Sequence, residues 1–214
     1  MPTGLETARQ MITVAFMALP MMIIAFTFFL GFGLGNVGLI LLFLGQITLA
    51  PAAAYLLQML SISKLPNYNI CNLVPSASGS GGLMNVAPSF WMAQFLFFIG
   101  YVLQNAITLY EQKPDVAAPE VKVQNRKEQA LTAIIVTSII AVIIVGLRLK
   151  LTGCETLLGT VIAAATMIPL GVAWYYFAAA CGIRNADVFG ISSKILPVGA
   201  TEPPPQVCVP KKTK

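Results

Sequence analysis

Residues 12–60 read ITVAFMALPMMIIAFTFFLGFGLGNVGLILLFLGQITLAPAAAYLLQML, and no charged residue interrupts them. A single helix of about 49 residues would be about 73 Å long at 1.5 Å per residue, whereas the hydrocarbon core of a bilayer is about 30 Å thick. The run must therefore fold back on itself. A tight turn is least strained at the glycines and the asparagine of 31–36. We therefore predict two spans, at about 12–34 and 37–60, joined by that turn.

Three further apolar runs follow, so the sequence predicts an all-α, polytopic transmembrane bundle of about five spans within a membrane domain of residues 1–182. The expected spans are about 12–34, 37–60, 89–110, 130–149 and 157–180. Composition agrees, because 57% of the residues are hydrophobic and 10% charged, whereas soluble domains carry about 25% charged residues. The alternative is four spans, with the first pair forming a re-entrant hairpin. Residues 183–214 are expected to form an extended, polar, Pro-rich tail.

Two polar connectors separate the later spans. Residues 61–88 are rich in Asn, Ser, Gly and Pro and are expected to form a loop. Residues 111–129 carry charges of both signs, and Pro114 and Pro119 argue against a continuous helix there. The fourth span is therefore expected to begin at Ala130.

Charged and aromatic residues at the span ends indicate the topology. Trp91 and Tyr110 suit the two interfacial aromatic belts, and Arg148 and Lys150 are expected to extend to the membrane surface. With five spans, nine of the thirteen basic residues fall on the side of the C-terminal tail. The positive-inside rule then places that side in the cytosol.

The polar side chains within the spans have two interpretations. They could hydrogen-bond between helices, or they could line a pathway through the membrane. These side chains are Gln46, Gln94, Gln104 and Asn105. A second motif, Gly159-x-x-x-Ala163, offers a small helix face that could pack within the chain or form a homo-oligomer.

The predicted topology places Cys71 and Cys154 on the same side of the membrane, opposite the tail. A disulfide between them would join the two loops on that side if their Cα atoms lay within about 7 Å. The alternative is two free thiols.

The residues point to no enzyme. The chain has no histidine, and its carboxylates are scattered, so neither a catalytic acid–base pair nor a metal site is expected. The literal G-x-G-x-x-G pattern at 33–38 lies between two apolar runs rather than between a strand and an amphipathic helix, so a turn is expected there and no cofactor. The chain has no stripe of basic residues interleaved with aromatics, so nucleic acid is not expected as a partner.

The whole pattern resembles small multi-span membrane proteins of nucleocytoplasmic large DNA viruses, the chlorella-virus and mimivirus-like group. The paired N-terminal spans carry the resemblance together with short motifs further along. These motifs are CNLVP at 71–75, APSFWM at 87–92, GCE at 153–155 and QVCVP at 206–210.

The resemblance implies a structural protein of the virion's internal membrane, present in host endomembranes during assembly, that anchors the lipid bilayer to capsid or minor capsid proteins. Such viruses often encode thiol oxidases, which favours the Cys71–Cys154 bridge. The loops and the tail, including Lys211, Lys212 and Lys214, are the expected partner contacts. A small transporter or channel is the first alternative, and a membrane enzyme or its accessory subunit the second.

Overall fold

The computed structural model describes residues 4–60, 63–64, 86–112, 120–152, 155–181 and 188–189. Its elements, in chain order, are α1 (Gly4–Leu34), α2 (Val37–Ile47), α3 (Leu49–Met59), β1 (Ser63–Lys64), β2 (Val86–Ala87), α4 (Phe90–Glu111), α5 (Glu120–Leu147), the π-helical turn η3 (Arg148–Thr152) and α6 (Leu157–Ala180). The prediction of an all-α fold is confirmed. The strands β1 and β2 contribute two residues each, and their antiparallel pairing ties together the two ends of the first loop.

Five helical stretches among the described residues are long and apolar enough to cross a membrane. They are Phe16–Leu34, Val37–Met59, Phe90–Glu111, Val123–Lys150 and Leu157–Ala180. Large apolar side chains on their outer faces are exposed, including Phe29 at 69% and Val142 at 73%. Such faces need hydrocarbon rather than water as their surroundings. The chain is therefore an integral membrane protein.

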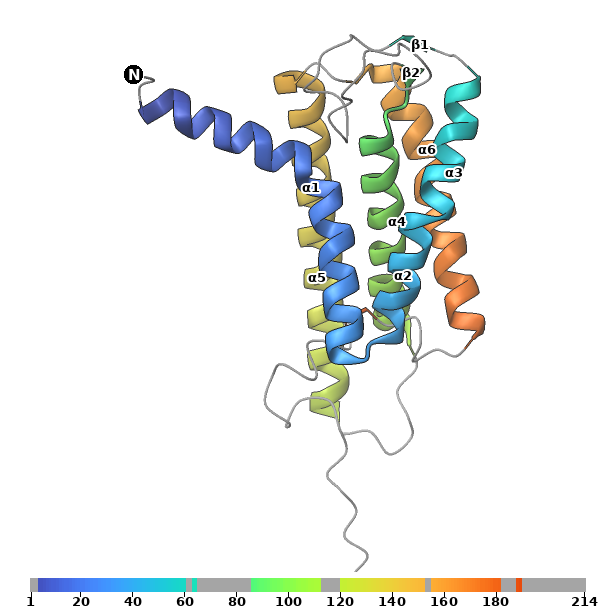
Figure 1. Cartoon of the computed structure of the whole chain (residues 1–214). Coiled ribbons are helices and arrows are strands. Elements are labelled where there is room, and N and C mark those ends of the chain that lie inside the picture. The colour runs from blue at the N-terminus through green and yellow to red at the C-terminus, as the bar shows by residue number, and fades with distance from the viewer. Residues whose placement is uncertain are drawn as a thin grey trace, which may run out of the picture.

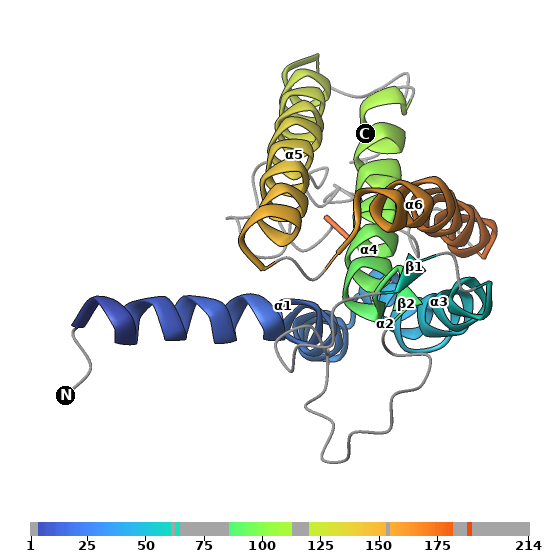
Figure 2. The ribbon, with the colours of Figure 1, turned by 90° about the horizontal axis from the view of Figure 1, so that it is seen from above.

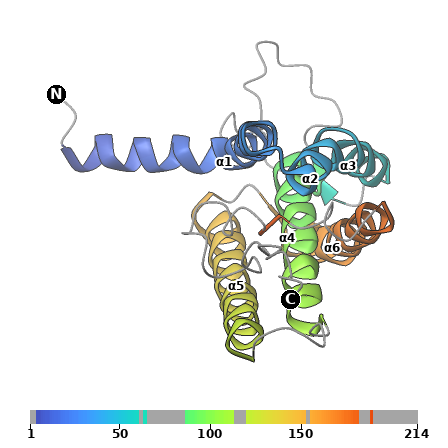
Figure 3. The same ribbon diagram turned by 90° about the horizontal axis from the view of Figure 1, so that it is seen from below.

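Helix α4 lies at the centre of the bundle, with α5 on one side, α6 on another, and α1, α2 and α3 around its remaining face (Figures 1 and 2). The view from the opposite end shows the same arrangement, with α5 standing apart from α2, α3 and α6 (Figure 3). The largest fully buried side chains accordingly include Trp91, Phe95, Phe97 and Tyr101 of α4.

The turn between the first two spans forms where it was predicted. Gly35 has φ of 63°, a conformation that glycine adopts without the steric cost of a Cβ atom. Asn36 then caps α2, because its side chain accepts a 3.1 Å hydrogen bond from the Leu39 N–H. The predicted hairpin is confirmed within the described residues.

The second predicted span consists of two helices. It breaks at Thr48 into α2 and α3. Pro51 has no N–H and its ring crowds the Ile47 carbonyl, so α2 cannot continue through this point. The Thr48 hydroxyl donates to the Leu44 carbonyl at 2.6 Å, and the same carbonyl accepts from the Thr48 N–H at 3.1 Å.

The helix that contains the predicted fourth span begins before Ala130. Helix α5 begins at Glu120, directly after Pro119, so about ten residues of the polar connector are helical. A proline disrupts the helix that precedes it but is compatible with one that starts beside it. Glu120 in the first turn also interacts favourably with the helix dipole.

Helices α4 and α6 approach each other most closely through reciprocal glycines. A Cβ atom at Gly100 would overlap the Ile168 carbonyl oxygen, and one at Gly171 would overlap the Phe97 carbonyl oxygen. The α6 side of this contact is a row of buried residues four positions apart. The row consists of Gly159, Ala163, Met167, Gly171 and Tyr175. The small Gly159/Ala163 face therefore packs inside the chain.

Two residues beyond the predicted domain boundary at 182 also contact the bundle. Val188 is 6% exposed and belongs to the hydrophobic core, and Phe189 packs against that core. The packed membrane domain thus includes these two residues of the segment that was assigned to the tail.

Candidate functional site

Polar side chains converge at the end of the bundle where α4 begins. Ser89 caps α4, since its hydroxyl accepts a 3.1 Å hydrogen bond from the Met92 N–H. The preceding peptide unit is held from two sides. Gln58 Nε2 of α3 donates to the Pro88 carbonyl at 2.9 Å, and Glu155 Oε1 accepts from the Ser89 N–H at 3.1 Å. The start of α4 is thereby joined to α3 and to the segment before α6.

Trp91 connects this end of α4 to α1. Pro20 lies inside α1 and has no N–H, so the carbonyl four residues earlier, at Phe16, has no helical donor. The Trp91 indole N–H donates to that Phe16 carbonyl at 3.1 Å. The two rings also stack, with their centroids 5.2 Å apart. A defect that proline creates in one helix is therefore satisfied by a side chain of another.

Arg148 lies on the same indole ring. Its guanidinium carbon is 4.7 Å from the centroid of the Trp91 ring, a cation–π distance. The side chains of Arg148 and Trp91 are 0% and 1% exposed. The predictions that Trp91 lies in an interfacial belt and that Arg148 extends to the surface are therefore wrong. Instead the ring and the nearby Glu155 carboxylate compensate the buried charge, while Lys150 is the cation that remains exposed.

Glu155 lies between the fourth and fifth spans and is 6% exposed. Burial raises the pKa of its carboxyl, and the hydrogen bonds from Ser89 and the positive charge of Arg148 oppose that rise. Its second oxygen, Oε2, is buried without a hydrogen-bond partner among the described residues. We call the set Ser89, Trp91, Arg148 and Glu155 the α4-end cluster.

A second polar group lies within the membrane, where α1, α2 and α4 meet. The Thr27 hydroxyl donates to Gln46 Oε1 at 3.2 Å. Gln94 Nε2 donates to the Gln46 carbonyl at 2.8 Å, in the last turn of α2 where carbonyls have no helical donor. Gln46 and Gln94 are 1% and 5% exposed. The structure thus places these two glutamines in helix-to-helix hydrogen bonds, the first of the two interpretations of the sequence.

The other two polar residues predicted within the spans lie in α4. Gln104 Nε2 donates to the Tyr176 hydroxyl of α6 at 3.0 Å. Asn105 is 0% exposed. Gln104 therefore bridges α4 and α6, and Asn105 lies in the packed interior of the bundle.

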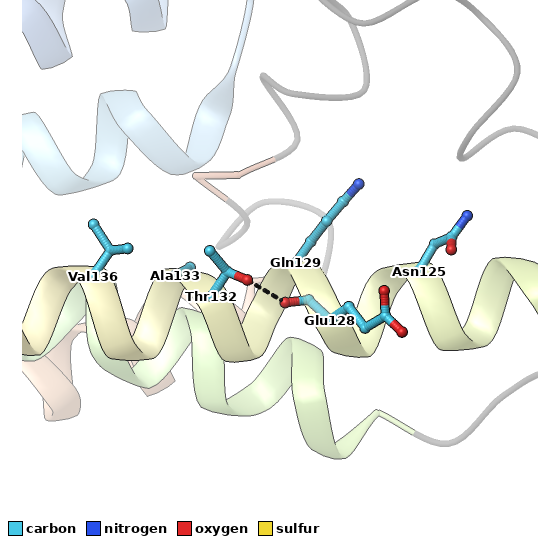
Figure 4. Close-up of a pocket in the computed structure, with 6 residues that line it drawn as sticks. All are labelled: Asn125, Glu128, Gln129, Thr132, Ala133 and Val136. Atoms are coloured by element: carbon cyan, nitrogen blue, oxygen red, sulfur yellow. Dashed lines mark hydrogen bonds between the residues drawn. The ribbon is translucent and has the colours of Figure 1, made fainter.

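An open groove of about 520 Å³ runs along α5, lined by Asn125, Glu128, Gln129, Thr132, Ala133 and Val136. Figure 4 shows these side chains arranged along one helix, with the Thr132 hydroxyl donating to the Glu128 carbonyl at 2.8 Å. The lining is polar towards the N-terminal end of α5. The groove lies along the N-terminal half of α5, whereas Arg148 of the α4-end cluster follows the other end of that helix, so the two are separate.

The remaining predicted site residues lie outside the described residues. These are the possible disulfide pair, Cys71 and Cys154, and the possible partner contacts Lys211, Lys212 and Lys214. Among the residues that the structure describes, no group of three or more histidine, cysteine, aspartate or glutamate side chains could hold a metal ion. Cys181 is an exposed thiol.

Sequence reasoning did not find the α4-end cluster. It treated Glu155 as isolated and Arg148 as a surface anchor. One signal was available, because Pro20 leaves the Phe16 carbonyl in need of a donor. The sequence states that need but does not identify Trp91 as the donor.

No protein-family model, no curated protein and no solved structure matches the chain. The resemblance to membrane proteins of large DNA viruses therefore stays a prediction from the sequence motifs.

Proposed function

We propose that this chain is a structural membrane protein that anchors the internal membrane of a large DNA virus to minor capsid proteins. Its spans hold it in lipid, and its connectors and tail contact neighbouring proteins. The observation that carries the structural role is the use of Gln46 and Gln94, whose amide groups join helices in the membrane interior.

The α4-end cluster supports the same role. Its hydrogen bonds and its cation–π contact join α1, α3, α4 and η3 at one membrane boundary. Each of these contacts joins elements that are far apart in the sequence, so together they fix how those elements pack. A rigid bundle keeps its loops at fixed positions, which suits a protein that connects a lipid layer to a protein shell.

Helix α5 extends the rigid part of the protein towards a partner. Arg126 NH2 donates to the Gln112 carbonyl just beyond the end of α4, so the first turns of α5 continue past that helix. Glu120, Lys127 and Glu128 are exposed on this extension. The charged turns and the groove beside them offer a neighbouring protein a surface that is already ordered before it binds.

Virion fractionation tests the proposal. Gradient-purified particles should contain the chain, and mild detergent should release it together with the lipid, while the major capsid protein stays in the shell. Cross-linking before extraction should join the chain to a minor capsid protein. Recovery of the chain only from host membranes, and never from particles, would contradict the viral role.

Flux measurements separate this function from that of a transporter. The purified chain in vesicles should carry no ion or solute flux above that of empty vesicles. Flux that is abolished by Gln94→Leu would show that the amides line a pathway, and the structural role would then be wrong.

A further inference from the structure

Helix α1 is longer than a membrane span needs to be. Its 31 residues correspond to about 46 Å of helix, against a hydrocarbon core of about 30 Å. Phe16–Leu34 is by itself long and apolar enough to cross that core. We call the part of the helix that precedes it, residues 4–15, the α1 arm.

The α1 arm leaves the bundle sideways. Figure 1 shows the first half of α1 turned away from the direction of its second half, and Figures 2 and 3 show the arm extending away from every other element. Pro20 is the proline inside α1, and prolines are the commonest cause of sharp helix bends. The Trp91 indole N–H donates to the Phe16 carbonyl, the acceptor that Pro20 leaves without a helical donor, and so stabilises α1 at its bend.

The arm departs at the level of the membrane boundary. Phe16 stacks on Trp91, the second residue of the membrane-spanning helix α4. Arg148 lies on the same ring, and Lys150, two residues further along, is exposed. The bend in α1 therefore lies level with the start of α4 and with the end of α5. A helix that turns sideways there runs along the headgroup layer.

The sequence of the arm has the pattern of a surface helix. Its apolar residues recur three or four positions apart, at Leu5, Ala8, Ile12 and Ala15. Polar residues recur between them, including Glu6 and Gln10 and also Arg9 and Thr13. A helix with this spacing has one apolar stripe and one polar stripe, as helices that lie in the membrane interface do.

We infer that the α1 arm is an interfacial helix that binds the surface of the same bilayer that its own chain spans. Its partner is the boundary between headgroups and acyl chains, continuous with the lipid contacts of the exposed Met22 and Phe26 in the span. Bound there, the arm limits how far the protein can tilt in the membrane. This inference does not depend on the proposed viral function.

Site-directed spin labelling of the full chain in phosphatidylcholine vesicles tests the inference. A nitroxide attached through a genetically encoded keto residue leaves the four native cysteines unchanged. Labels at Ala8 and Ile12 should be more accessible to oxygen than to a water-soluble nickel complex, at a depth of about 5–10 Å. Labels at Glu6 and Gln10 should show the reverse.

Reference labels set the two limits of the measurement. Met22 is 58% exposed within the span and reports lipid, whereas Glu120 is exposed, precedes the stretch Val123–Lys150 and reports water. Labels at Thr13 and Ala15 repeat the comparison if a variant of the first set does not fold. Nickel accessibility at Ala8 and Ile12 equal to that at Glu120 would overturn the inference. Shielding of both positions from both reagents would also overturn it, since it would mean that protein covers the arm.

Discussion

Gln58 and Glu155 hold opposite ends of the same peptide unit. The unit is the Pro88–Ser89 peptide. Gln58 donates to its carbonyl, and Glu155 accepts from its N–H. The carbonyl and N–H of a trans peptide point in opposite directions. The two side chains, 97 positions apart in the sequence, therefore fix both the position and the rotation of the peptide that leads into the central helix.

The pH dependence of stability should report the buried Glu155 carboxyl. Its pKa in the folded protein is raised above the ordinary value of 4.5. A group whose pKa is higher in the folded than in the unfolded protein contributes to the free energy of unfolding. That contribution is complete below the pKa of the unfolded state and is lost as the pH rises through the pKa of the folded state. Stability should therefore fall as the pH rises above about 4.5, by at most about 1.4 kcal/mol per pH unit from this group.

Glu155→Gln provides the comparison for that pH dependence. The amide oxygen of the variant can still accept from the Ser89 N–H, but the side chain does not titrate. Unfolding midpoints in mixed micelles, measured from pH 4 to pH 7, should converge at low pH and separate as the pH rises above the ordinary pKa of the carboxyl. Parallel pH profiles for the two proteins would show that Glu155 does not titrate in this range.

Arg148→Met should destabilise the protein at neutral pH by about 3–5 kcal/mol, because it removes the cation near a buried carboxylate. Adding Glu155→Gln to this variant should recover about 1 kcal/mol or more, since the two side chains are coupled. Lys150→Met is the matched control at an exposed cation and should change stability by less than about 0.5 kcal/mol. Additive effects of the two substitutions in the double variant would argue against coupling between Arg148 and Glu155.

The close contact of α4 and α6 predicts the effect of two small substitutions. Gly100→Ala and Gly171→Ala each place a Cβ atom against a carbonyl oxygen of the facing helix. Each should lower the free energy of unfolding by about 1–3 kcal/mol. Gly146→Ala is the control, since nothing lies within 4 Å of its Cβ position. It should stabilise α5 by roughly 0.5–1 kcal/mol through helix propensity, and equal losses at all three sites would contradict the packing argument.

Gln94→Leu should cost about 0.6 kcal/mol, with an upper range of about 2 kcal/mol, because it removes a hydrogen bond between two membrane helices. The loss should appear as a lower unfolding midpoint in mixed micelles. Gln124→Leu replaces an exposed glutamine that donates to Glu128, one turn along its own helix, and serves as the control. An unchanged midpoint for Gln94→Leu would mean that this amide does not hold the helices together.

The span pattern could be predicted because it depends on local properties. The length of each apolar run determines whether it can cross about 30 Å of hydrocarbon, and the Gly35–Asn36 turn follows from conformational preference at single residues. The break at Thr48 and the helical start at Glu120 were missed. Both depend on the asymmetric effect of proline, which disrupts the helical turn that precedes it but is compatible with a helix that begins beside it. The sequence analysis did not use this asymmetry.

The sequence by itself determined that the chain lies in a membrane, how many times it can cross, and where its first turn occurs, because these depend on the transfer of contiguous segments from water to lipid. Only the tertiary structure decided that Arg148 and Trp91 face inward, that Trp91 satisfies the Phe16 carbonyl, and that Glu155 meets the start of α4. The physical reason is that a buried polar group needs a partner. The partner is chosen by which helices pack side by side, and no local pattern in the sequence contains that information.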